Sequence, residues 1–184
     1  MMERSRLVFS GSGGQGIITA AIILATAAVL FENKNAIQSQ SYGAAARGGA
    51  TRSDIIIDDS EIYFPKVIQP NILVSLTQES YDKFAPIIRP GGLLLVDSKY
   101  VTIGKKVDAK HIILPMFDTV TKDIGKPIVF NICMLGALIG ISKLIRPESI
   151  LKVLETTIPE DFMAMNKKAL EMGLEMGEKA RLLI

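Results

Sequence analysis

Cysteine and histidine are nearly absent from this sequence, and their scarcity excludes several kinds of site. Among 184 residues only Cys133 is a cysteine, so the chain has no disulfide framework and no four-thiolate set for an iron–sulfur cluster. The single histidine, His111, stands at the start of a predicted strand with no acid or cysteine partner beside it, which favours a structural role. Any redox metal would therefore have to be held by another chain.

Strong net charge and membrane-length apolar runs are also missing. The formal net charge is +2, which gives no indication of nucleic-acid binding. The short, charged stretch before residue 7 lacks the apolar centre of a signal peptide, and the apolar stretches 17–31 and 128–142 fall short of the roughly 20 residues that cross a membrane. We therefore expect a cytoplasmic protein with no membrane or nucleic-acid partner.

Apolar residues are abundant instead. They make up 48% of the chain, and the mean hydropathy is +0.32. Such values indicate strands that are buried on both faces, or apolar surface that is reserved for a partner. The length suits one domain with a substantial core, so residues 1–184 are predicted to form a single domain.

A glycine-rich turn near the amino terminus is the main candidate site. Residues 7–9 form a predicted strand and residues 17–31 a predicted helix, and between them the chain reads Gly-Ser-Gly-Gly-Gln-Gly. Glycines let the backbone turn sharply and let a ligand approach closely. The free N–H groups and the dipole at a helix start favour an anion such as phosphate. The candidate residues are Gly11, Gly13, Gly14, Gln15 and Gly16.

Two nucleotide-binding interpretations of this turn are weakened by the residues that come after it. A dinucleotide fold places an acid at the end of its second strand, and the predicted second strand, 36–40, ends without one. A Walker A loop needs Lys and then Ser or Thr after its last glycine, where this chain has Ile17 and Ile18. A turn that only packs the helix against the sheet remains the alternative.

A second glycine-containing segment comes after the second strand. Residues 39–52 are small and polar, and they carry Arg47 and Arg52 close to Gly48 and Gly49. The guanidinium fork suits phosphate or carboxylate. In a βαβ unit the loops after the first two strands lie at the same end of the sheet, so we expect one shared anion-binding rim. A flexible surface loop with solvated arginines is the alternative.

The rest of the chain alternates between strands and helices. This alternation predicts an α/β fold: a Rossmann-like three-layer sandwich with a mostly parallel sheet, one β-hairpin, and helices on both faces. The hairpin is expected at 51–64, further strands at 71–76, 93–97, 101–103 and 111–114, and helices at 78–88, 116–124, 128–144, 147–157 and 161–176.

The predicted helix 128–144 is apolar almost all round. Asn131 is the exception, and it either caps the helix or faces a neighbouring chain. Gly136 and Gly140 share one face, which predicts close packing against another element. Cys133 is expected to pack as a small apolar residue.

Five short motifs occur along the chain in a fixed order. They are Gly-Ser-Gly-Gly-Gln-Gly at 11–16, Gln-Ser-Gln-Ser-Tyr-Gly at 38–43, Ala-Arg-Gly-Gly-Ala-Thr at 46–51, Glu-Ile at 61–62 and Asn-Ile-Cys-Met-Leu-Gly at 131–136. This ordered set resembles the gamma subunit of the 2-oxoacid:ferredoxin oxidoreductases, over residues 7–173. The Gln-Ser-Tyr-Gly and Ala-Arg-Gly-Gly versions are most similar to those of the 2-oxoglutarate enzymes; pyruvate, 2-oxoisovalerate and indolepyruvate enzymes carry related subunits.

The resemblance implies a subunit of a larger enzyme. In that family the alpha and beta subunits hold thiamine diphosphate, [4Fe-4S] clusters lie on other chains such as a ferredoxin-like delta subunit, electrons pass to ferredoxin, and the acyl group passes to coenzyme A. The gamma subunit is associated with assembly and with coenzyme A access. We therefore expect this chain to bind no cofactor alone, to be inactive in isolation, and to have no catalytic or metal-binding residue.

The residues and the resemblance together define a predicted site. The glycine turn at 11–16 is expected to accept an anion, and Arg47, Gly48 and Gly49 are expected to contact phosphate of coenzyme A or a partner subunit. Asn131 is expected to line the same edge. Two rival hypotheses remain: a stand-alone nucleotide-binding oxidoreductase domain, and a purely structural assembly subunit whose glycine loops only hold neighbouring chains.

Overall fold

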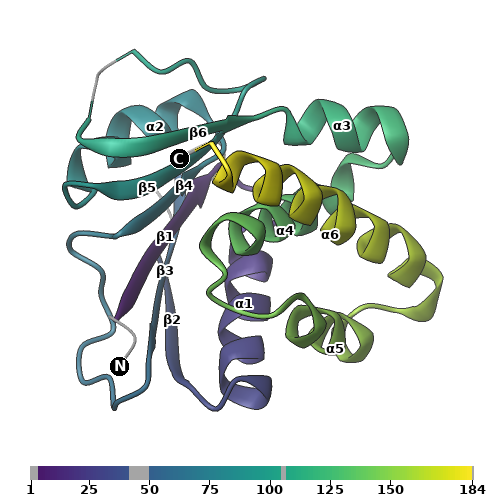
Figure 1. Ribbon diagram of the computed structural model, residues 1–184, viewed down its shortest axis with the longest axis horizontal. Coiled ribbons are helices and arrows are strands. Elements are labelled where there is room, and N and C mark those ends of the chain that lie inside the picture. Colours follow the sequence, from purple (N-terminus) through teal and green to yellow (C-terminus); the bar gives the residue numbers. More distant parts are fainter. Residues whose placement is uncertain (1–3, 42–49, 105–106, 184) are drawn as a thin grey trace.

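A six-stranded sheet with helices on both faces forms the framework of the chain (Figure 1). The computed structural model describes residues 4–41, 50–104 and 107–183. The strands are β1 (Ser5–Gly11), β2 (Asn35–Ser41), β3 (Thr51–Asp58), β4 (Ile72–Ser75), β5 (Gly92–Asp97) and β6 (Ala109–Leu114). The helices are α1 (Ile17–Phe31), α2 (Gln78–Phe84), α3 (Met116–Asp123), α4 (Phe130–Ser142), α5 (Pro147–Thr157) and α6 (Glu160–Arg181), and the 3₁₀ turns η1 (Ala85–Ile87) and η2 (Pro127–Val129) precede β5 and α4.

The sheet is mostly parallel, with one antiparallel insertion. Its strand order is β2-β3-β1-β4-β5-β6. Strands β1, β4, β5 and β6 are parallel neighbours, whereas β3 runs antiparallel to both β1 and β2. Strand β2 therefore points the same way as β1, and the carboxyl ends of both lie at one edge of the sheet. This confirms the α/β class and the predominance of parallel pairs.

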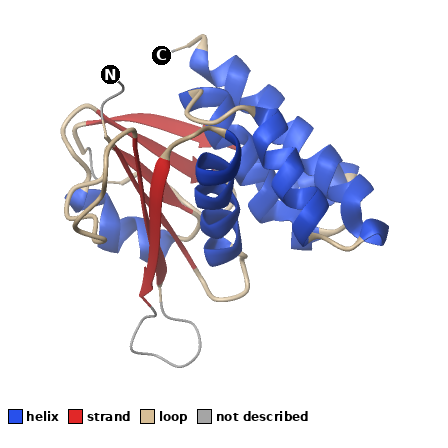
Figure 2. Cartoon of the chain, turned by 90° about the horizontal axis from the view of Figure 1, so that it is seen from below, coloured by secondary structure: helices blue, strands red, loops and turns tan. Residues whose placement is uncertain are grey.

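The two faces of the sheet are covered unequally (Figure 2). One face packs against α1, α3, α4, α5 and α6 in a large apolar core, and the other packs against α2 and the neighbouring loops in a smaller one. The parallel strands β4 and β5 are buried on both faces, which explains their nearly continuous apolar sequences. None of the described helices is long and apolar enough to span a membrane.

The predicted hairpin at 51–64 is wrong, although a hairpin exists one element earlier. Strand β3 pairs with β2 on one side and with β1 on the other, so both of its edges are used before residue 61 is reached. Residues 61–66 form a loop instead. The small strand predicted at 101–103 is also not a strand.

Helices α4 and α6 pack backbone to backbone, which confirms the prediction made for Gly136 and Gly140. A Cβ at Gly140 would stand 2.6 Å from the carbonyl oxygen of Leu174, and one at Gly136 would overlap that of Leu170. On α6, Gly173 and Gly177 make the same kind of approach to α4. Small residues at matched positions therefore fix the separation of the two helices.

Candidate functional site

The glycine turn lies where β1 ends and α1 begins, at the carboxyl edge of the parallel strands. Gly14 and Gly16 have φ angles of +89° and +70°, in the region that only glycine adopts readily. Gly16 is the residue that precedes the first turn of α1, and no side chain among the described residues caps that turn. The helix start therefore keeps backbone N–H donors for an anion.

Gln15 spans the crevice beside this turn. Its Oε1 accepts a hydrogen bond from the backbone N–H of Ser12 at 2.8 Å, and its Nε2 donates to the carbonyl oxygen of Leu76, directly after β4, at 3.2 Å. The helices that come after β1 and β4 lie on opposite faces of the sheet, so this is the switch point where a dinucleotide fold binds its ligand. The Gln15 side chain bridges the two strand ends across that position, and this arrangement disfavours the stand-alone dinucleotide-binding hypothesis.

Asn131 reaches the same turn from the start of α4. Its Nδ2 donates to the carbonyl oxygen of Gly16 at 3.2 Å, across 115 residues of sequence. A Cβ at Gly16 would lie 2.5 Å from that nitrogen, so the site needs glycine here for space as well as for its φ angle. The amide of Asn131 therefore holds the start of α1. It contacts neither the start of its own helix nor another chain through this hydrogen bond.

A pocket of about 290 Å³ opens beside Asn131 and the turn. One side is polar, formed by the turn and by the amides of Asn131 and Asn166, and the other is apolar, with Ile128 and Phe162 exposed near its rim. Its full lining is Gly14, Gly16, Thr19, Ile128, Val129, Asn131, Ile132, Ile158, Pro159, Phe162, Met165 and Asn166. Such a pocket suits a ligand with both a polar and an apolar part.

The predicted residues Arg47, Gly48 and Gly49 lie outside the described residues. The residues that flank this segment are described, and they stand close to the glycine turn. Thr51 pairs with Gly11, and Arg52 pairs with Ser41 at the end of β2. The described residues on either side of 42–49 thus lie at the edge of the sheet where the turn lies, and the shared anion-binding rim stays a prediction.

Arg52 has a structural role. Its guanidinium binds the carboxylate of Asp54 with N–O distances of 2.5 and 3.2 Å, and it also donates to the carbonyl oxygen of Val67. Asp54 accepts the backbone N–H of Val67 at 2.9 Å in return. The pair fixes the loop after β3 against the sheet.

Sequence reasoning missed Asp97, at the carboxyl end of β5. Its buried carboxylate accepts backbone hydrogen bonds from Lys99 at 3.0 Å and from Phe117, at the start of α3, at 2.8 Å. Burial raises the pKa of Asp97 in spite of these bonds. The only sequence signal was an acid that ends an apolar strand.

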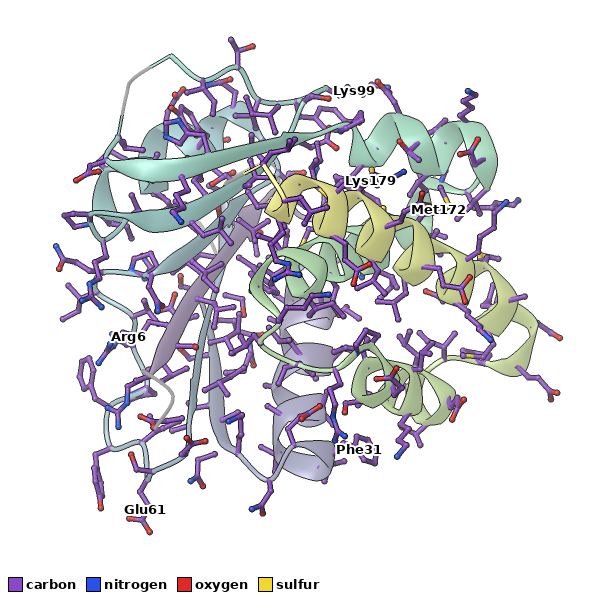
Figure 3. All side chains as sticks on the ribbon, in the orientation of Figure 1. Arg6, Phe31, Glu61, Lys99, Met172 and Lys179 are labelled. Carbon is purple, nitrogen blue, oxygen red and sulfur yellow. The ribbon has the colours of Figure 1, made fainter. Side chains whose placement is uncertain are left out.

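Lys99 lies beside α3 at this end of the sheet (Figure 3) and pairs with Asp118 at 2.9 Å.

The described residues offer binding groups at this edge and no reactive nucleophile. Cys133 is fully buried, which confirms its packing role, and burial raises the pKa of its thiol to about 12, with a further contribution from the charge of Asp97. No group of three or more potential metal ligands occurs within the ranges that the structure describes. The chemistry available here is recognition of a ligand or a partner.

Comparison with known proteins decides the family. The sequence pattern of the pyruvate ferredoxin/flavodoxin oxidoreductase family matches residues 6–176. The chain belongs to this family. It is 43% identical to a 2-oxoglutarate synthase subunit (KorC) of Methanocaldococcus jannaschii, over 96% of this chain and 95% of the relative.

Two further family members indicate which subunit of the enzyme this chain corresponds to. A solved gamma subunit of a keto/oxoacid ferredoxin oxidoreductase from Geobacter sulfurreducens superposes with a TM-score of 0.89 at 38% identity, covering 97% of this chain and 99% of that one. The ketoisovalerate oxidoreductase subunit VorA of Methanothermobacter marburgensis is 30% identical over 95% of this chain, but the match covers only 37% of VorA. The resemblance is thus confirmed, and the chain is a gamma-type subunit of a multi-subunit 2-oxoacid:ferredoxin oxidoreductase.

Proposed function

We propose that this gamma-type subunit serves a 2-oxoglutarate:ferredoxin oxidoreductase, which forms succinyl-coenzyme A while it reduces ferredoxin. The observation that carries the proposal is the 43% identity to a 2-oxoglutarate synthase subunit along almost the whole of both chains. The ketoisovalerate relative, at 30%, is more distant. We assign the iron–sulfur clusters to partner chains, since one buried cysteine supplies no cluster ligand set. We assign thiamine diphosphate to partner chains because the family resemblance implies it.

Within that complex, the proposed task of this chain is to bind coenzyme A at the edge formed by the glycine turn. The uncapped start of α1 and the open backbone at Gly13 and Gly14 offer donors for phosphate, and we propose that the guanidinium of Arg47 adds to them. Asn131 holds the turn in place. The thiamine cofactor of the partner chains would carry the bond-breaking chemistry, so this chain needs no nucleophile of its own.

The substrate is tested with the co-expressed complex, purified without oxygen. Coenzyme A-dependent reduction of ferredoxin is measured with 2-oxoglutarate, pyruvate, 2-oxoisovalerate and indolepyruvate. We expect the highest kcat/KM with 2-oxoglutarate and no activity from the isolated chain. A higher kcat/KM with another 2-oxoacid contradicts the substrate assignment and leaves the family intact.

The coenzyme A role is tested with Arg47→Ala in the same complex. Loss of one charge-assisted hydrogen bond, worth about 1.5–3 kcal/mol, predicts a KM for coenzyme A about tenfold or more above wild type, with the KM for the 2-oxoacid unchanged. Arg181→Ala, at the exposed end of α6, is the matched control. If Arg47→Ala alters neither the KM for coenzyme A nor assembly, the assignment of Arg47 fails.

A further inference from the structure

Helix α1 presents an apolar side to solvent. All 15 residues of α1 are uncharged, and its buried side faces the sheet. The opposite side includes Ile22 and Val29, each 47% exposed, and Leu30, 65% exposed. A helix at a protein surface normally carries polar and charged residues on its outer face, and a helix that is apolar all round is normally buried. The exposed side of α1 therefore has the apolar composition that is expected of a surface covered by another chain.

The adjacent edge of the sheet has the same character. Strand β2 is the last strand of the sheet and packs beside α1, as Figure 1 shows. Exposed edge strands are usually protected by charged side chains, lysine above all. Residues 35–41 carry none.

The absence of charge extends well beyond these two elements. Between residues 7 and 46 the only charged residues are Glu32 and Lys34. Glu32 pairs with Arg146 at 3.0 Å, and Lys34 pairs with Asp59 at 2.7 Å. Both charges are thus paired within the chain, at the margin of the surface. Depletion of charge is the compositional mark of the buried centre of a protein interface.

We propose that this charge-free surface, formed by Ile22, Val29 and Leu30 of α1 and the outer edge of β2, docks the catalytic chain of the complex. By catalytic chain we mean the partner that holds thiamine diphosphate under the proposed function, and we infer that it corresponds to the part of VorA beyond the 37% that matches this chain. The inference rests on the proposed function, because it requires that the chain work within such a complex.

The fused arrangement of VorA favours this occupant over a second copy of the chain. In VorA, one polypeptide carries a region that corresponds to nearly the whole of this chain together with a longer remainder. A covalent link supplies a high effective concentration of one part for the other. The Methanocaldococcus jannaschii relative, 95% of which matches this chain, has no such remainder, so its contact with a partner depends on surface affinity. A neutral, apolar surface provides such contact without leaving unpaired charges in the interface.

The first test measures whether the surface is covered in the assembled complex. Cys133 is buried, and burial raises the pKa of its thiol to about 12, so it reacts slowly with alkylating reagents. A cysteine introduced at the surface is therefore the reactive thiol of this chain. Ile22→Cys is alkylated with iodoacetamide in the isolated chain and in the complex. We expect the rate in the complex to fall at least tenfold. Leu182→Cys, at an 81% exposed position after α6, is the control and is expected to react equally in both.

The second test identifies the occupant. The Kd between the purified gamma chain and the catalytic chain is measured by analytical ultracentrifugation, together with the mass of the gamma chain alone. Ile22→Glu is expected to raise that Kd at least tenfold without changing the thermal unfolding midpoint, and Leu182→Glu to leave it unchanged. A photo-crosslinker is attached to the introduced thiol of the Ile22→Cys variant and activated in the complex. We expect it to be linked to peptides of the catalytic chain.

Several results would overturn this assignment. Equal alkylation of Ile22→Cys in the isolated chain and in a complex that turns over 2-oxoglutarate refutes the docking surface and leaves the proposed function standing. Self-association that Ile22→Glu abolishes, or crosslinks only to a second copy, assigns the surface to a homodimer instead. If the wild-type chain does not associate with the catalytic chain at all, both proposals fail.

Discussion

Substitution of Gly173 by alanine should destabilise the chain, although alanine is the better helix former. The added Cβ would overlap the carbonyl oxygen of Cys133 and stand 2.9 Å from the backbone nitrogen of Ala137. Both neighbours are backbone atoms of α4, so relief requires the two helices to move apart. Such a shift also disturbs Gly136 and Gly177, which make somewhat longer but still close backbone contacts along the same seam.

The magnitude is set by two opposing effects. Replacement of glycine by alanine within a helix stabilises by about 1 kcal/mol. Overpacking a tight contact costs about 1–3 kcal/mol, and a clash between rigid backbones falls at or beyond the upper end. We therefore expect Gly173→Ala to lower the free energy of unfolding by about 2 kcal/mol. For a domain of this length that corresponds to a melting midpoint about 4–8 °C below wild type.

The measurement is urea unfolding monitored by circular dichroism at about 222 nm, the helix band, with thermal unfolding as a second series. Gly104→Ala is the control, because an added Cβ there has no atom within 4 Å. A shift of α4 should also expose the Cys133 thiol, so its reaction with a disulfide reagent should accelerate in the Gly173 variant. If Gly173→Ala is as stable as wild type or more stable, the glycine contacts do not set the separation of the helices.

Two other side chains allow further predictions. Gln15→Ala removes the bridge between the glycine turn and the end of β4, so the melting midpoint should fall by an amount equivalent to about 1–2 kcal/mol; an unchanged midpoint would show that the bridge is dispensable. Burial raises the pKa of Glu32, but hydrogen bonds from Ser149 and Arg146 outweigh it and hold the pKa below the ordinary 4.5. Its ionised form therefore stabilises the fold above about pH 4.5, and that contribution is lost as the pH falls through the lowered value. Glu32→Gln should flatten this part of the curve of unfolding free energy against pH, and identical wild-type and variant curves would refute the assignment.

Local patterns in the sequence predicted most of the secondary structure. The mainly apolar stretch 17–31, which lacks proline and glycine, coincides with α1, and the proline at 147 marks the start of α5 as expected. These elements arise from glycine and proline positions and from apolar spacing, which act over a few residues. The tight seam between α4 and the last helix was predicted in part, since two glycines on one helix face indicate a close neighbour without identifying it.

The site was predictable as far as its chemistry is local. A glycine-rich turn before a helix provides anion donors wherever it occurs, so the turn at 11–16 could be located from sequence alone, and its binding of an anion stays a prediction. The role of Gln15 could not, because its acceptor, the carbonyl oxygen of Leu76, is 61 residues away. The same holds for Asp97, whose hydrogen bond to Phe117 depends on where α3 starts relative to β5.

The sequence by itself determined the positions of most helices and strands, the location of the glycine turn and the family. It also determined that the chain has a single cysteine. Only the tertiary structure decided that β3 enters the sheet between β2 and β1, which removes the predicted hairpin at 51–64. Only the tertiary structure brought Asn131 to Gly16 and left one side of α1 uncovered. The physical reason is that strand order and helix contacts depend on the apolar area buried by the whole chain, a sum over distant residues that no local pattern contains.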